Sequence, residues 1–417
     1  MIDKRLLKLV IISSFILKMI FIFFFHSENL TNEWRVLLNN FEDLGILSYY
    51  YLDGQYLPSS YMPPLYLIFL YLNKLISFNL FNFMYLVFFF QVIISTVSVY
   101  FFYTICRHFF NYNFSNIGAI IFAFFPLLIY SNALISSATL QILLYLIFFN
   151  FCLNLIDQKK KQNILLFSLV CACCLLLRGE FLVIFFFTLI FFSIFTKKKL
   201  KFTLILFLTT LLIISPYLIR NFINTNKIHI VNVTGYALWK GNNHLSKVEG
   251  YHFTLSPKPK RRLTWPDIPE FENLYKNLDK VEINKNYETK RDKVFLNEAI
   301  KNILSDKKKY TILYFKKVLS YFFIDLNSSI KNYYNPIHII PVFGIAILSF
   351  LGGLLSIKKN KSLKLYYLLM VMILLIMLIS VFYILPRYKI SIIIFQILFS
   401  LFSLEFIFKK IKKKYFN

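Results

Sequence analysis

Several side chains that can carry chemistry occur singly, next to long apolar runs of the sequence. Glu33 lies in an Asn-Glu-Trp sequence after the first run, and Glu42 and Asp43 follow shortly after it. A carboxylate held beside a membrane by an anchoring tryptophan, here Trp34, can act as a general base toward a hydroxyl or amine acceptor. We therefore take Glu33 as the candidate base and Glu42 and Asp43 as reserves. The plain alternative is an acid solvated in a loop.

Three arginines also lie beside apolar runs. Arg178 precedes Gly-Glu180, Arg220 follows Ser-Pro-Tyr-Leu-Ile, and Arg387 follows a Leu-Pro pair. A guanidinium at the level of lipid head groups can form two hydrogen bonds with one phosphate. The arginines therefore favour an anionic lipid head as ligand. Snorkelling toward ordinary phospholipid stays open, as does a simple interface anchor for Arg178 and Glu180.

A stretch rich in glycine and asparagine opens the longest polar segment, at Trp239-Lys-Gly-Asn242-Asn243. Glycine and asparagine permit tight turns, and the side chains of tryptophan and asparagine are common sugar-contacting groups. By its spacing alone this stretch is a weak indication of a sugar site.

The elements that position these residues are expected to be membrane helices. The chain has 417 residues, of which 58% are hydrophobic and 16% charged. Because a helix needs ~20 mostly apolar residues to cross a bilayer, the recurring apolar runs predict an all-α integral membrane protein. The spans are expected at about 6–25, 84–105, 115–131, 137–156, 163–178, 181–195, 201–219, 337–357, 364–385 and 390–408.

The lysines predict the orientation of these spans. The net charge is +27, and the lysine clusters between adjacent apolar runs are typical of cytoplasmic loops, not of a nucleic-acid-binding face. All clusters fall on one side only if residues 62–78, which contain Pro63-Pro64, lie along the outer surface or re-enter it. Both termini are then cytoplasmic. The expected units are a membrane module (1–219) with an outer loop (26–83), an outer domain (220–336) and a second membrane module (337–417).

The composition also argues against other classes of protein. The predicted helices carry almost no ionisable residue at mid-membrane, which disfavours a pump or antiporter. The exceptions, Lys18 and Glu405, are expected to reach toward the interface. The five cysteines lie in or at the ends of apolar runs, so neither a disulfide framework nor a metal site is expected from them.

Taken in order, these segments resemble the bacterial glycosyltransferase family 39, within the GT-C superfamily of enzymes that use polyprenyl-phosphate sugars. That superfamily includes protein mannosyltransferases and the lipid A aminoarabinose transferase. A departure is Asn32, where the family usually has a first acid before Glu33. The matching pieces span most of the chain: Asn32-Glu33-Trp34, Met62-Pro-Pro-Leu-Tyr66, Leu176-Leu-Arg178-Gly-Glu180, Ser215-Pro-Tyr-Leu-Ile-Arg220-Asn221, Trp239-Lys-Gly-Asn242-Asn243 and Pro386-Arg387-Tyr388.

The resemblance implies a GT-C-like bundle of about ten transmembrane helices, with a re-entrant or interfacial helix and a small α-rich periplasmic domain, in the bacterial inner membrane. It implies transfer of a sugar from a polyprenyl-phosphate donor to an envelope lipid, polysaccharide or protein. Glu33 would deprotonate the acceptor, and Arg220 or Arg387 would hold the departing phosphate. The residues expected to bind substrate are Asp43, Tyr66, Arg178, Glu180, Arg220, Asn221, Asn242, Asn243, Arg387 and Tyr388.

Nothing in the sequence requires a metal, although a divalent ion remains open. Neither the sugar nor the acceptor can be read from these residues. One alternative is a non-catalytic component that binds, polymerises or translocates a lipid-linked glycan. Another is a membrane scaffold.

Overall fold

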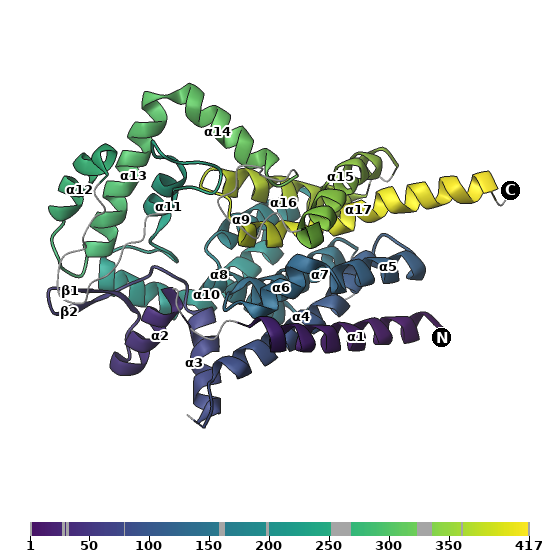
Figure 1. Cartoon of the computed structure of the whole chain (residues 1–417), viewed down its shortest axis with the longest axis horizontal. Helices are drawn as coiled ribbons and strands as arrows, with labels where there is room; N and C mark the ends of the chain where they lie inside the picture. The colour runs from purple at the N-terminus through teal and green to yellow at the C-terminus, as the bar shows by residue number, and fades with distance from the viewer. Residues whose placement is uncertain are drawn as a thin grey trace.

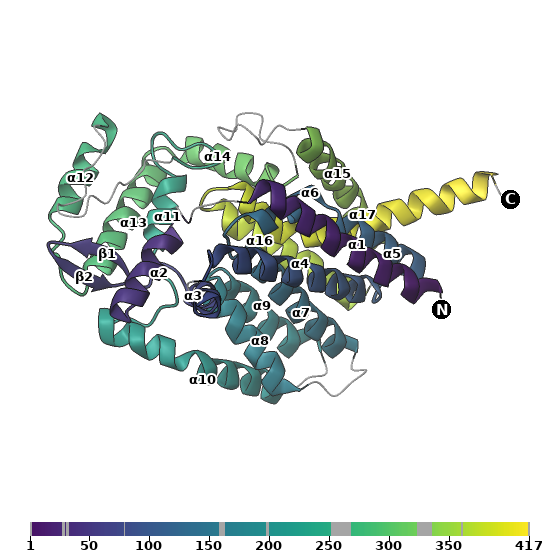
Figure 2. The same ribbon diagram turned by 60° about the horizontal axis from the view of Figure 1, so that its bottom comes forward.

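The computed structural model describes residues 2–26, 30, 33–78, 80–157, 163–196, 200–251, 268–322, 336–359 and 362–415. Long helices form a bundle, a smaller helical domain covers one end of it, and both termini lie at the other end (Figures 1 and 2). Asn32 and the lysine clusters at 159–161 and 197–199 lie outside the described residues.

The bundle contains the apolar helices. Its elements are α1 (Ile2–Phe25), α4 (Met84–Cys106), α5 (Tyr112–Ala123), α6 (Pro126–Tyr130), the 3₁₀ turn η1 (Ser131–Ala133), α7 (Ala138–Asp157), α8 (Ile164–Leu177), α9 (Phe181–Phe195), α10 (Leu200–Thr225), α15 (Pro336–Lys359), α16 (Leu363–Ser380) and α17 (Pro386–Tyr415).

Seven helices in the described part are long and apolar enough to cross a membrane, or eight if α5 and α6 count as one bent span. The predicted helix at 115–131 is therefore not continuous. Its two parts are bent by 50°, because Pro126 has no N–H to donate to the preceding turn. Helices α8 and α9 have only 14 and 15 residues, so about ten spans are reached only if these short helices also cross.

The remaining elements lie toward the end of the bundle away from the two termini (Figure 1), and we call them the outer elements. Most of them are helices. They are α2 (Glu33–Leu44), β1 (Ser48–Leu52), β2 (Gln55–Pro58), α3 (Leu65–Ser77), α11 (Thr234–Gly241), the 3₁₀ turn η2 (Pro269–Phe271), α12 (Glu272–Asp279), α13 (Tyr287–Ser305) and α14 (Lys307–Leu319). Helix α3 runs across the direction of the long helices (Figure 1), as an interfacial helix does.

Two features of these outer elements were not expected from the sequence. Strands β1 and β2 form an antiparallel hairpin, whose turn residues Asp53 and Gly54 both have positive φ. An Asp-Gly pair between runs of tyrosine and leucine is a hairpin signal that could have revealed it. The described residues of the polar segment 245–293 also contain regular structure, namely η2, α12 and the start of α13.

Two expectations about single residues are wrong. Lys18 does not reach the interface, because it is 1% exposed and its Nζ atom donates to the carbonyl oxygen of Ser95 over 3.4 Å. Trp34 is not a membrane anchor, because it is 5% exposed and its ring packs edge-on against Tyr66, with 4.9 Å between the ring centroids. Most of the length of both side chains is apolar, so they can pack between helices. These helices are distant in the chain, and the sequence alone does not show that they are neighbours.

Candidate functional site

Glu33 lies in the first turn of α2, where a helix N-terminus favours a negative charge. The residue is half-buried, and its carboxylate interacts electrostatically with Arg387 and Lys240. Burial, followed by the charge of Glu33, raises the pKa of Tyr49 to about 12. These interactions place the carboxylate at the outer end of the bundle, between the first loop and the chain around α17.

Lys240 completes the cationic side of this site. Burial and the neighbouring Arg387 lower its pKa to about 8, while Glu33 opposes that shift. Its Nζ atom lies 4.8 Å from the ring centroid of Tyr383, and the Tyr388 hydroxyl donates to the Tyr383 hydroxyl over 3.2 Å. Lys240, which lies within the Trp239-Lys-Gly stretch, and Tyr383 are not among the residues expected from the sequence to bind substrate.

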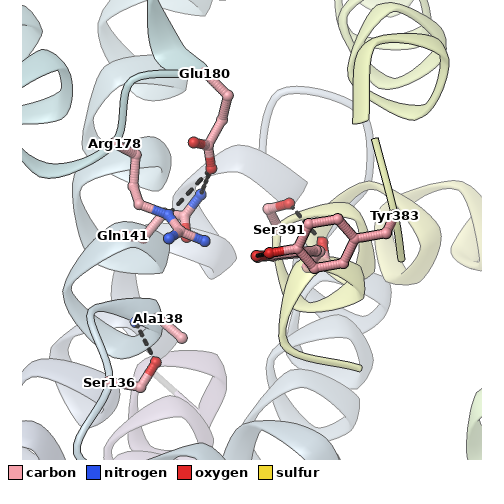
Figure 3. A network of polar contacts seen from close by, with 8 residues as sticks. Ser136, Ala138, Gln141, Arg178, Glu180, Tyr383 and Ser391 are labelled. Atoms are coloured by element: carbon pink, nitrogen blue, oxygen red, sulfur yellow. Dashed lines mark hydrogen bonds and ion pairs between the residues drawn. The ribbon is translucent and has the colours of Figure 1, made fainter. Parts of the chain in front are cut away.

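Arg178 and Glu180 lie at the junction of α8 and α9, near the first turn of α17. Arg178 Nε and Glu180 Oε1 are 3.1 Å apart, and Gln141 of α7 donates to the same carboxylate over 3.3 Å. The guanidinium carbon of Arg178 lies 5.7 Å from the centroid of the Tyr388 ring. Figure 3 shows the group of Arg178, Glu180 and Gln141 opposite Tyr383. The structure thus brings residues of α2, α8, α11 and α17 to one end of the bundle.

Arg220 and Asn221, near the end of α10, form their hydrogen bonds with protein groups outside the cluster around Glu33 and Arg387. Arg220 donates to the carbonyl oxygens of Ser59 and Leu47 over 2.7 and 2.8 Å and to Asn221 Oδ1 over 2.9 Å. Asn221 donates to the carbonyl oxygen of His229. These contacts fasten the outer end of α10 to the first loop.

Asn242 and Asn243 are buried at the end of α11. The Asn242 amide donates to the carbonyl oxygens of Leu238 and Val381 over 2.9 and 2.8 Å, and that of Asn243 donates to the Trp239 carbonyl. Through Val381, Asn242 joins the outer domain to the turn between α16 and α17. In these positions both amides serve the protein's own backbone.

Tyr66 and Asp43 lie apart from each other. Tyr66 is 1% exposed, and its hydroxyl donates to Gln91 Oε1 over 3.1 Å, whereas Asp43 is exposed near the end of α2. In the described part of the chain, no group of three His, Cys, Asp or Glu side chains is placed to hold a metal. We therefore derive no chemical step through a metal.

No family model and no curated protein matches the sequence. The fold is similar to that of an oligosaccharyltransferase from Archaeoglobus fulgidus. The apo form of that protein has a TM-score of 0.57 at 12% identity, covering 98% of this chain and 51% of the other. Its complex with an inhibitory peptide and a dolichol-phosphate has a TM-score of 0.55 at 13% identity, covering 97% and 51%.

A third structure of that enzyme, tethered to an acceptor peptide, has a TM-score of 0.53 at 11% identity and covers 97% of this chain. The present chain spans about half the length of these proteins. The likeness and the apolar helices define a multi-pass integral membrane protein with the GT-C fold, all-α in its described residues apart from the β1–β2 hairpin.

Proposed function

We propose that the chain is a membrane glycosyltransferase that moves a sugar from a polyprenyl-phosphate donor to an acceptor in the cell envelope. The proposal rests on the electrostatic interaction of Glu33 with both Arg387 and Lys240 at the outer end of the bundle. A carboxylate facing two cations suits a reaction that removes a proton on one side and releases a phosphate on the other. The similar archaeal enzyme bound to a dolichol-phosphate supports a lipid-linked donor.

The proposed reaction is a single displacement at the anomeric carbon. The acceptor oxygen or nitrogen attacks that carbon while Glu33 takes the acceptor's proton. The bond between the anomeric carbon and the phosphate oxygen breaks, and the phosphate leaves with the electron pair. Arg387 and Lys240 stabilise the charge on the departing phosphate, and the polyprenyl tail lies between the helices. Because phosphate is a good leaving group, positioning and charge stabilisation supply most of the catalysis.

We assign different roles to Arg387 and Arg220. Arg387 is exposed at the start of α17, next to Tyr388, and is therefore available to a ligand. Arg220 donates to two backbone carbonyls and one side-chain amide. We therefore assign phosphate binding to Arg387 and not to Arg220. Arg178 lies over the ring of Tyr388 and so packs against the first turn of α17.

The proposed location is the bacterial inner membrane, with the site on its outer face and both termini in the cytoplasm. The two termini lie at the same end of the bundle, and α2 and α11 lie toward the other end (Figure 1). The exposed lysines that end α17 agree with this orientation because basic segments are retained in the cytoplasm.

The test is mass spectrometry of envelope glycolipids and glycoproteins from a deletion strain that carries the wild type, Glu33→Gln or Asp53→Asn. Asp53 is a matched control because it is an exposed acid in the β1–β2 turn of the same loop. We expect Glu33→Gln to lower transfer by about 10²–10⁴-fold, with accumulation of the lipid-linked donor. Asp53→Asn should restore transfer fully.

Two outcomes would contradict the proposal. If Glu33→Gln restores transfer as well as the wild type does, Glu33 is not the base. If deletion changes no envelope sugar, the chain is not a glycosyltransferase but a scaffold. Purified Glu33→Gln protein separates an enzyme from a non-catalytic binding component. If Glu33 serves the chemical step, this variant should bind the donor lipid with unchanged affinity while sugar transfer is lost.

A further inference from the structure

Helix α14 has two faces of unusual character. Tyr310, Leu313 and Lys317 on one face are buried. On the other face Ile312, Phe315 and Leu319 are 47%, 59% and 52% exposed. A helix that faces water on its outer side normally presents polar residues there. Large apolar side chains repeated on the exposed face therefore indicate a non-aqueous neighbour.

The C-terminal half of α14 lies beside the end of one membrane span, and the residues that follow it lie deeper. The Tyr314 hydroxyl donates to the carbonyl oxygen of Met377 over 3.3 Å, and Met377 belongs to the last turn of α16. Just beyond α14, the carbonyl oxygen of Tyr321 accepts a bond from Gln396 over 2.6 Å. Because Gln396 comes ten residues after the start of α17, this contact lies roughly 15 Å along that helix.

Phe322, the residue after Tyr321, lies at a similar depth beside α15. The ring of Phe322 lies 6.4 Å from that of Phe350, which is in the interior of α15. Figure 1 shows α14 running from the tip of α13 back to the bundle beside α16. Helix α14 therefore descends obliquely from the outer domain to the level of the spans.

The charges of α14 are distributed as this descent requires. Lys307 and Lys308 are exposed in its first turn, farthest from the bundle, and the helix contains no acidic residue. Lys316 is exposed between Phe315 and Leu319, and a long lysine stem can carry its ammonium back to the head groups. A basic beginning followed by an apolar exposed face is complementary to the head-group and acyl layers of one leaflet.

We propose that α14 is an interfacial helix whose exposed face inserts obliquely into the outer leaflet, with its first turn on anionic head groups. The exposed apolar residues of α16, including Ile373 and Met377, continue this surface along a span, which favours lipid over a protein partner. The buried face of α14 holds the turn before Arg387 through Lys317, so the leaflet also fixes the height of that turn. The proposal does not depend on the activity of the site.

The test uses the full-length protein in nanodiscs with bimane attached to single cysteines at 312, 315 or 319. Cys173 is replaced by serine, since the other four native cysteines are buried. Brominated acyl chains quench bimane only on contact. We expect quenching at all three positions comparable to that at Ile373→Cys and several-fold stronger than at Lys293→Cys, which is exposed on α13.

Quenching as weak as at Lys293→Cys would show that the face meets water and would overturn the proposal. Quenching that appears only after the detergent-purified protein is stripped of a co-purifying polypeptide would show that a protein covers the face, which overturns it equally. Both results leave the proposed sugar transfer untouched, because neither measures it.

The head-group part of the proposal has its own test. The bromines are placed either on phosphatidylglycerol or on phosphatidylcholine at the same mole fraction, with bimane at 312. We expect stronger quenching from the anionic lipid. The difference between the two lipids should become much smaller after Lys307→Gln and Lys308→Gln together, since each lysine near the surface changes the local preference about five-fold. Equal quenching in the unsubstituted helix would overturn the assignment of anionic head groups.

Discussion

The ammonium group of Lys317 donates to the carbonyl oxygen of Gly241 over 2.9 Å, so a residue of α14 holds the last residue of α11. The same Nζ atom donates to Asn242 Oδ1 and to the carbonyl oxygen of Phe382. Lys317 is fully buried. Gly241 is required here because a Cβ atom would lie 1.8 Å from the Phe382 oxygen. The outer domain and the turn that leads to Arg387 thus meet around one lysine.

We expect Lys317→Met to lower the free energy of unfolding by about 3 kcal/mol, because three buried oxygens lose their donor. Thermal unfolding of the purified protein in detergent measures the change. Lys301→Met is the matched control, since Lys301 is exposed on α13 and should be nearly neutral. Equal effects of the two substitutions would show that the three hydrogen bonds contribute little.

The same lysine gives a pH dependence. Burial lowers the pKa of Lys317 to about 7, so between pH 7 and about 10 the unfolded chain binds more protons than the folded one. Stability is therefore expected to rise with pH in that window. Unfolding midpoints of the wild type should increase from pH 7 to pH 9 more than those of Lys317→Met. Parallel profiles would contradict the shift.

Glu288 predicts the opposite slope at lower pH. Its carboxylate accepts from the Ser59 hydroxyl over 3.1 Å and from the Ser60 N–H over 2.8 Å, but burial raises its pKa to about 7. The folded chain then binds more protons between pH 4.5 and 7, and stability falls by up to about 3 kcal/mol as pH rises through that window. Glu288→Gln should flatten the fall, whereas the exposed Glu282→Gln should keep it. A wild-type midpoint that rises over this window would refute the prediction.

Arg387 and Arg220 should respond differently to substitution. Arg387→Ala is expected to lower sugar transfer by about 10²–10³-fold with little loss of stability, as for removal of a charge-stabilising donor. Arg220→Ala should lower the free energy of unfolding by about 2–3 kcal/mol, because the carbonyl oxygens of Ser59 and Leu47 lose their donor. Transfer assays and thermal unfolding on both variants provide the comparison. If both variants lost transfer equally and kept equal stability, the assignment of phosphate binding to Arg387 and not to Arg220 would be contradicted.

Two neighbouring glycines of α15 provide a packing prediction. A Cβ atom on Gly352 would lie 1.8 Å from the carbonyl oxygen of Phe399 in α17, whereas one on Gly353 meets only Leu369 at 4.0 Å. Gly352→Ala should therefore destabilise the protein by about 1–3 kcal/mol, and Gly353→Ala should stabilise it by up to about 1 kcal/mol through helix propensity. Unfolding midpoints should shift in opposite directions. A rise in both would mean that α15 and α17 can separate freely.

The amino-acid sequence by itself determined the membrane class, the approximate positions of the long helices and the short α3. Those features depend on runs of apolar residues and on local proline, and such signals act within a segment. The order of motifs along the chain also indicated a GT-C fold, which the structural comparisons confirm.

Only the tertiary structure decided which polar side chains are available to a substrate. Arg220 and Arg387 have similar sequence surroundings, yet Arg220 bonds to a loop far away in the chain while Arg387 is exposed beside Glu33 and Lys240. Trp34 and Lys18 resemble interface residues in the sequence but are buried against other elements. The physical reason is that the free energy of a polar group depends on partners contributed by distant segments, and these partners are fixed only when the helices pack.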